Sequence, residues 1–160
     1  MKALVAFFSA GGVTAKLAQT LAQAIDSDIY EIKPVTPYPS ADLDWRDDRS
    51  RSSVEMNDLS CRPPITDSDA PVADVDVVFI GFPIWWYREP SVVDTFLEAY
   101  DFTGKTVVPF ATSGSSGIGD SGKRMQQIAG NKARVLEGKR FTPGTSAQEL
   151  KKWVSTLEIE

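Results

Sequence analysis

Short apolar runs alternate with amphipathic stretches along most of this chain. The continuous apolar run Ala3–Phe8 ends in Ser9-Ala10-Gly11-Gly12, which predicts a strand buried on both faces. Thr14–Ile25 follows and predicts a helix, because four apolar residues share one helical face: Ala18, Leu21, Ala22 and Ile25.

The same alternation continues to the end of the chain. Apolar runs predict four further strands, over Asp28–Ile32, Val75–Phe82, Lys105–Thr112 and Ala133–Leu136. Helical spacing predicts three further helices, over Val92–Tyr100, Gly119–Ala129 and Ser146–Leu157. Ser146 is the expected N-cap of the last helix, with Glu149 completing a capping box.

Strands that alternate with helices predict an α/β fold, with a parallel sheet covered by helices on both faces. Right-handed crossovers place every strand-to-helix loop at one edge of the sheet, where such folds bind ligands. The loops of interest are therefore Ser9–Thr14, Pro83–Pro90 and Thr112–Gly119. We expect a single domain over residues 1–160, since no internal repeat or domain boundary is visible.

The segment Pro34–Val72 departs from this alternation and is rich in Pro, Ser, Asp and Arg. We expect an irregular or helical connection between the second and third strands, with a polar helix over Asp42–Leu59. Its charge cluster, Arg46-Asp47-Asp48-Arg49, is interpreted as a solvated face.

Composition excludes several kinds of chemistry. The 160 residues include no histidine, which removes Ser-His-Asp and Cys-His catalysis and imidazole metal ligands. Cys61 is the lone cysteine, so neither an internal disulfide nor a thiolate metal site is expected. The net charge of −5 argues against nucleic-acid binding.

Two patterns bear on location. No apolar run approaches the roughly 20 residues of a membrane span, so no membrane association is expected. The N-terminus resembles a signal peptide, but its apolar run breaks at Ser9-Ala10-Gly11-Gly12 and the polar residues Lys16, Gln19 and Gln23 follow. We therefore expect a cytoplasmic protein.

The first loop, Ser9–Thr14, follows a strand and opens a helix. Its glycines allow a ligand to approach the backbone, and the free first-turn N–H groups together with the helix dipole favour an anion. Because the loop contains no Lys or Arg, neutral donors would hold a phosphate monoester rather than cleave a triphosphate. The alternative is a tight turn with Thr14 as the N-cap.

The second loop contains three consecutive aromatic residues, Trp85, Trp86 and Tyr87. They cannot all point into the core, and a planar ring stacked on an indole would cover them. The alternative is a hydrophobic lid over the neighbouring helix.

The third loop, Thr112–Gly119, offers many backbone donors, which can surround the polar edge of a heterocycle. Gly117–Gly122 matches G-x-G-x-x-G, and Glu137 lies near the distance expected for the acid that binds a ribose, so a dinucleotide site is an alternative, although Gly117 follows the strand late. Gly117–Lys123 matches a P-loop only as far as its Lys, because Arg124 stands where Ser or Thr belongs.

Together these loops resemble flavodoxins. Ser-x-x-Gly-x-Thr between a strand and a helix resembles the flavodoxin phosphate loop, and Gly81–Tyr87, Thr95–Thr106 and Thr112–Gly117 resemble small flavodoxin-like proteins that hold FMN. The likeness covers nearly the whole chain in order. It implies a three-layer doubly wound sandwich with a five-stranded parallel sheet in the order 2-1-3-4-5.

The resemblance also implies an FMN site. The first loop would hold the phosphate, the second would line the isoalloxazine, and the third would contact its polar edge and the ribityl chain. The residues implied are Ser9, Gly12, Val13 and Thr14; Pro83, Ile84, Trp85, Trp86 and Tyr87; and Thr112, Ser113, Gly114 and Gly117.

This chain departs from flavodoxins at three points. Gly11 lies where flavodoxins usually have a second Ser or Thr, which removes a phosphate donor worth roughly 1–2 kcal/mol. Val13 stands where Asn is common, and the third loop offers no Tyr or Trp as a second aromatic wall.

Three functions remain open. The first is an electron carrier that passes electrons through bound FMN to a redox partner protein or a small acceptor, for which an acidic domain is suited. The second is an FMN-dependent NAD(P)H:quinone-type oxidoreductase, with a pocket that a second subunit, Arg88 or Pro34–Val72 would complete. The third is a module without flavin that uses Trp85–Tyr87 as a protein contact. The chain would act as a monomer or homodimer.

Overall fold

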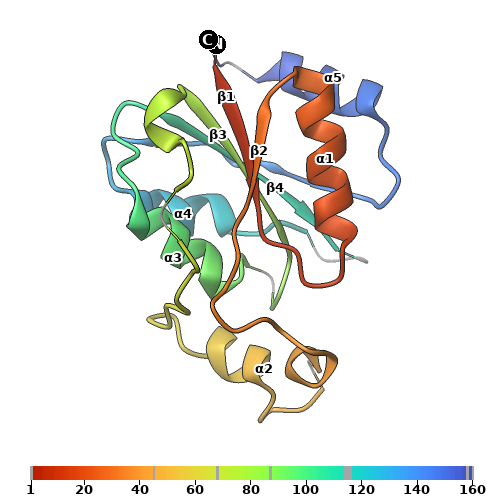
Figure 1. Ribbon diagram of the computed structural model, residues 1–160, viewed down its shortest axis with the longest axis vertical. Helices are drawn as coiled ribbons and strands as arrows, with labels where there is room; N and C mark the ends of the chain where they lie inside the picture. Colours follow the sequence, from red (N-terminus) through yellow and green to blue (C-terminus); the bar gives the residue numbers. More distant parts are fainter. Residues whose placement is uncertain are drawn as a thin grey trace.

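A parallel β-sheet between two pairs of helices forms the framework of the molecule (Figure 1). The computed structural model describes residues 2–44, 46–67, 69–86, 88–113, 117–157 and 159. The strand order is β2-β1-β3-β4-β5, and a further strand, β6, also pairs with β4. The strands are β1 (Ala3–Phe7), β2 (Asp28–Glu31), β3 (Val77–Pro83), β4 (Thr106–Thr112), β5 (Arg134–Val135) and β6 (Lys139–Phe141).

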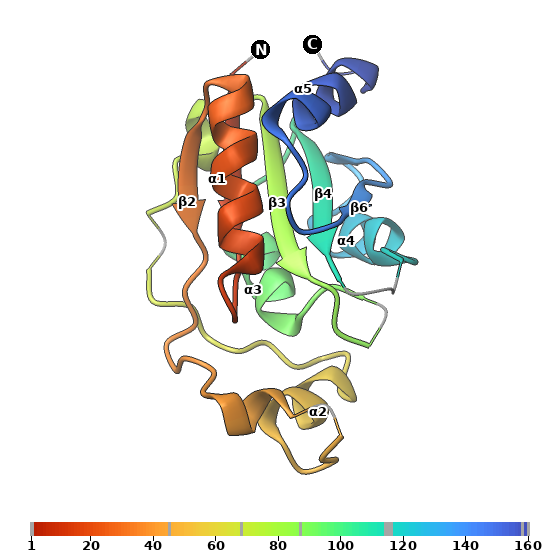
Figure 2. The same ribbon diagram turned by 90° about the vertical axis from the view of Figure 1, so that its right-hand side faces the viewer.

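Each face of the sheet has its own apolar layer. Helices α1 (Val13–Ile25) and α5 (Ala147–Thr156) cover one face, and α3 (Ser91–Ala99) and α4 (Ser121–Ala129) cover the other (Figure 2). This arrangement confirms the predicted doubly wound, flavodoxin-like fold and its strand order. Within the described residues, no helix combines the length and apolar character needed to cross a membrane.

Side chains alternate between these layers along the strands. Val5 and Phe79 pack with Leu21 of α1 and Trp153 of α5. On the other face, the core includes Leu4, Ile80, Phe82, Phe96 and Met125. Because the central strands are buried on both faces, they appear in the sequence as continuous apolar runs.

The first helix begins one residue earlier than predicted. Its N-cap is Gly12, which has φ +90° and no side-chain cap, so Thr14 lies inside the helix. The interpretation of Thr14 as an N-cap is therefore wrong. At the other end of the chain the Ser146 hydroxyl accepts a hydrogen bond from the Glu149 N–H at 3.2 Å, which confirms the predicted cap.

The edge of the sheet beside β4 differs from the prediction. One short strand was expected over Ala133–Leu136, but the edge contains two, β5 and β6, which pair with β4 on either side of Pro109. Proline has no N–H to donate to a ladder. Gly138 fills the break with φ +80°, where a Cβ would lie 2.3 Å from the Pro109 carbonyl oxygen. The backbone contact between Pro109 and Gly138 therefore accounts for the interruption.

The first part of the connection between β2 and β3, with α2, lies beyond the carboxyl ends of the strands, and its last part returns to the start of β3 (Figures 1 and 2). The three short helices of the connection are η1 (Ser40–Leu43), α2 (Arg51–Met56) and η2 (Val72–Asp74). The predicted helix over Asp42–Leu59 is therefore wrong in extent. Between η1 and α2, the Asp44 and Asp47 carboxylates accept hydrogen bonds from backbone N–H groups two residues on, which favours turns over helix. The Arg46–Arg49 cluster is exposed, as predicted.

Candidate functional site

The three loops surround a cavity of about 310 Å³ at the carboxyl edge of the sheet. This volume is at the small end of the range for ligand sites, so a larger cofactor would extend past the rim. The cavity is lined by Ser9, Ala10, Gly11, Val13, Thr14, Leu43, Pro83, Trp85, Thr112, Ser113 and Pro143. None of these described lining residues carries a charge.

The predicted site residues divide into three groups. Seven line the cavity: Ser9, Val13, Thr14, Pro83, Trp85, Thr112 and Ser113. Four others, Gly12, Ile84, Trp86 and Gly117, are not on its wall. Tyr87 and Gly114 lie outside the described residues. The assignment of FMN contacts to these residues stays a prediction.

The first loop lines the cavity and leads into a helix N-terminus with free backbone donors. The Ser9 hydroxyl accepts a hydrogen bond from the Gly12 N–H at 3.0 Å, which closes the turn before α1. The N–H groups of Val13, Thr14 and Ala15 open the helix and have no acceptor within it. These donors, together with the helix dipole, can bind an anion without a cationic side chain.

A buried hydroxyl pair joins the first loop to the third. Thr14 Oγ1 lies 2.8 Å from Thr112 Oγ1, and both side chains are buried. Each threonine also lines the cavity. This hydrogen bond fixes the start of α1 against the end of β4.

Trp85 is the only aromatic residue among the described cavity-lining residues, and other aromatic rings support it. Its ring packs edge-on against Phe8 at 5.6 Å and against Tyr38 at 5.3 Å between centroids. Reciprocal backbone hydrogen bonds of 3.1 Å between Trp85 and Arg88 close the loop as a tight turn. Trp86, inside that turn, has φ +50°, an unusual conformation for a bulky residue. Ile84 packs on the core instead.

The connection between β2 and β3 braces this aromatic wall. Tyr38 donates a hydrogen bond to Glu55 of α2, and the Arg51 guanidinium lies 3.9 Å from the centre of its ring. Burial and the Glu55 carboxylate raise the pKa of Tyr38, so its hydroxyl stays protonated. Leu43, at the end of η1, lines the cavity itself. The segment Pro34–Val72 therefore contributes to the wall of this cavity, while its part in a substrate pocket above a bound flavin stays a prediction.

Arg88 does not supply part of the pocket, and that expectation is wrong. Only 7% of the residue is exposed, and its guanidinium donates to the carbonyls of Met56 and Glu89 at 3.1 and 3.0 Å. It also donates to the Ser91 hydroxyl at 3.3 Å. Burial lowers the pKa of Arg88 below its ordinary value. Arg88 thus joins the aromatic loop to α2 from inside the molecule.

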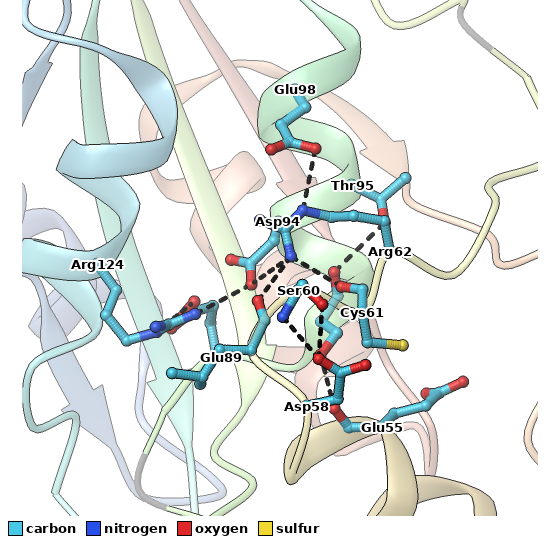
Figure 3. Close-up of polar contacts among 12 residues, drawn as sticks. Glu55, Asp58, Ser60, Cys61, Arg62, Glu89, Asp94, Thr95, Glu98 and Arg124 are labelled. Atoms are coloured by element: carbon cyan, nitrogen blue, oxygen red, sulfur yellow. Dashed lines mark hydrogen bonds and ion pairs between the residues drawn. The ribbon is translucent and has the colours of Figure 1, made fainter.

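Two fully buried carboxyl groups, those of Glu89 and Asp94, lie beside the guanidinium of Arg124 (Figure 3). Arg124 of α4 approaches both carboxylates at 3.3 Å. Arg88 and Arg62 lie 3.6 and 3.9 Å from Asp94. Asp94 Oδ1 is buried without a hydrogen-bond partner. Burial and the neighbouring Glu89 raise the pKa of Asp94 to about 8, so this carboxyl holds a proton at neutral pH.

Four cavity-lining residues were absent from the predicted site: Ala10, Gly11, Leu43 and Pro143. Ala10 and Gly11 lie within the predicted first loop, so their position between Ser9 and Gly12 in the sequence is a signal that could have identified them. Leu43 lies in a segment in which apolar residues follow no regular spacing, and Pro143 follows β6, a strand that was not predicted. No local pattern indicated these two.

Packing explains the last glycine of the Gly117–Gly122 pattern, Gly122. Gly122 lies inside α4, where a Cβ would come within 2.9 Å of the Leu136 carbonyl oxygen. This glycine allows α4 to approach the chain after β5. Among the described residues, no group of three or more His, Cys, Asp or Glu is placed to hold a metal ion.

Comparisons with known proteins agree with this geometry. The flavodoxin family profile matches residues 2–157. The chain is 45% identical to a candidate flavoprotein of Bacteroides eggerthii, with 99% of both chains covered and a TM-score of 0.93. It is also 45% identical to a candidate flavoprotein of Bacteroides uniformis, with 96% and 97% covered and a TM-score of 0.90.

A more distant structure shares the fold. A flavoprotein of Lactobacillus acidophilus in complex with FMN is 21% identical, with 96% and 98% of the two chains covered and a TM-score of 0.73. A search of curated proteins found no match. Because the family profile spans nearly the whole chain, this protein belongs to the flavodoxin family.

Proposed function

We propose that this protein binds FMN in the cavity beside Trp85 and transfers electrons through it. The observation that carries the proposal is the meeting, in one cavity, of helix N-terminal donors, the Thr14–Thr112 hydroxyl pair and a braced indole. Neutral donors suit a phosphate monoester, and an indole suits a flat ring. The Lactobacillus acidophilus flavoprotein, which holds FMN, supports the same cofactor here.

Each part of the site has a distinct task. The N–H groups of Val13, Thr14 and Ala15 would bind the phosphate, while Trp85 would cover one side of the ring system. Leu43 and Pro143 add apolar surface that excludes water from the cavity. FMN supplies the redox chemistry by accepting and releasing one or two electrons, and the protein tunes it.

Titration of the cofactor-free protein with FMN tests this proposal. We expect a change in the visible flavin spectrum and at least about tenfold tighter binding of FMN than of riboflavin, because only FMN carries the anion for the helix N-terminus. Trp85→Leu should weaken FMN binding by about tenfold, through loss of an aromatic contact. Trp86→Leu is the matched control, since Trp86 is not on the cavity wall. If the visible spectrum of FMN is the same with and without saturating protein, the proposal is overturned.

Gly11 offers a gain-of-function test at the phosphate end. A Cβ at Gly11 would meet nothing within 4 Å, and its φ is not in the left-handed region. We expect Gly11→Ser to tighten FMN binding by about tenfold, the effect of one added hydrogen bond, relative to Gly11→Ala. Equal affinities of the two variants would show that the phosphate lies elsewhere.

Turnover separates electron transfer from substrate reduction. An electron carrier that is reduced chemically should pass electrons to an acceptor, without steady-state oxidation of NADH or NADPH when it is alone. Rapid oxidation of either nucleotide by the pure protein would assign it to the reductase class instead.

A further inference from the structure

One cationic side chain lies directly behind the neutral wall of the cavity. Arg140, in β6, donates from Nε to the Ser113 hydroxyl at 2.9 Å and from Nη2 to the Ser113 carbonyl at 3.1 Å. Ser113 lines the cavity, and so does Pro143, three residues after Arg140. The guanidinium is therefore separated from the cavity by a single residue.

The interrupted edge of the sheet brings Arg140 to this place. Arg140 pairs with Ala111 of β4, so it lies near the carboxyl end of that strand. Phe141, its neighbour, packs in the core beneath α1 and α5. Because side chains alternate along a strand, the Arg140 side chain lies on the other face, where it contacts Ser113 at the start of the third loop. Lys139 shares the face of Phe141, since its ammonium lies 5.5 Å from that ring.

The position of this charge has an electrostatic consequence. The described residues of the cavity wall are all neutral, and the first loop contains no Lys or Arg. A unit charge several ångströms from a partly solvated site still acts on a ligand there. Full reduction of FMN takes up two electrons and one proton and leaves the ring negatively charged, so a nearby cation favours the reduced form.

We propose that Arg140 is a positioning residue of the cofactor site: it fixes Ser113 through two hydrogen bonds, and its charge favours reduced over oxidised FMN. This inference rests on the proposed FMN binding. The protein's net charge of −5 by itself disfavours a negatively charged ring, and the positive charge of Arg140 opposes that effect.

Midpoint potentials of the FMN complexes, reduced with dithionite, test this inference. Arg140→Gln removes the charge and keeps a hydrogen-bonding amide, so we expect reduced FMN to bind about tenfold less tightly relative to oxidised FMN. That ratio corresponds to a midpoint about 30 mV lower for a two-electron couple. Lys139→Gln, on the opposite face of the same strand, removes the same charge and should change the ratio by less than about twofold. Arg140→Lys should remain close to the wild type.

Two further results complete the test. Ser113→Ala removes the hydroxyl that anchors the guanidinium without changing the net charge, so we expect a smaller shift in the same direction. It provides a second variant if Arg140→Gln does not fold. Equal potentials for Arg140→Gln and Lys139→Gln, or an unshifted potential in Ser113→Ala when Arg140→Gln does not fold, would overturn the role of Arg140 while leaving FMN binding intact. Failure of the wild type to bind FMN would overturn both proposals.

Discussion

The first loop and the base of the second lie at the same edge of the sheet but use opposite kinds of polar group. The first loop has no charged side chain and offers N–H groups and hydroxyls to the cavity. The base of the second loop gathers Arg88, Glu89, Asp94 and Arg124 into a charged cluster with little exposure to water.

This difference separates ligand binding from loop support. The buried charges are directed at one another and at backbone carbonyls, so they hold the aromatic loop and α2 in place. The neutral groups of the first loop leave N–H donors available to bind a ligand anion. The comparison predicts that variants in the cluster act mainly on folding, whereas variants in the first loop also act on cofactor affinity.

The largest expected effect is that of Arg88→Ala. This variant removes the bonds to the carbonyls of Met56 and Glu89 and leaves the buried Glu89 carboxylate with less compensating positive charge. We expect a loss of about 3–5 kcal/mol in the free energy of unfolding, measured by chemical denaturation. Arg49→Ala, an exposed arginine, should change it by less than about 0.5 kcal/mol. Equal effects of the two variants would contradict the supporting role of the cluster.

Asp94→Asn tests the buried proton. The raised pKa of Asp94, about 8, means that the folded state holds a proton that the unfolded state releases above its ordinary pKa. Stability from this group is complete at low pH and is lost as the pH rises towards 8, at up to about 1.4 kcal/mol per pH unit. We therefore expect Asp94→Asn to gain stability relative to the wild type between pH 5 and 7.

Denaturation curves across that pH range provide the measurement, and Asp48→Asn, at an exposed carboxylate, provides the control. A stability difference between Asp94→Asn and the wild type that does not change with pH would show that Asp94 is ionised in the folded protein.

Thr14→Val breaks the hydroxyl pair between the first and third loops. It leaves the Thr112 hydroxyl buried without its partner, at a cost of about 1–3 kcal/mol in unfolding free energy. The double variant Thr14→Val with Thr112→Val should recover part of that loss, because no unpaired hydroxyl remains. Strict additivity of the two single effects would show that the hydroxyls do not interact.

Gly12→Ala has the smallest expected effect and tests the backbone of the first loop. Gly12 has φ +90°, whereas Gly11 has open space and no such φ. We expect Gly12→Ala to lower the free energy of unfolding by about 1–2 kcal/mol and to weaken FMN binding. Gly11→Ala should change stability by less than about 0.5 kcal/mol. The same melting and titration experiments check both variants, and indistinguishable variants would remove the special role of Gly12.

Local patterns in the sequence were sufficient for the alternation of strands and helices and for the position of the cavity, whereas the strand order came from the resemblance to flavodoxins. The buried strands β1, β3 and β4 appear as apolar runs, and the loops that follow them are rich in small or aromatic residues. Because parallel strands end at one edge, these loops had to meet. Seven predicted residues therefore line one cavity.

The sequence thus determined by itself the layers of the fold, the edge that carries the site and the neutral donors of the first loop, since each depends on residues close together in the chain. Only the tertiary structure decided that Leu43 and Pro143 line the cavity, that Arg88 turns inward and that Arg140 lies behind Ser113. These placements depend on docking the β2–β3 connection and on the break between Pro109 and Gly138, contacts between distant segments that no short-range period encodes.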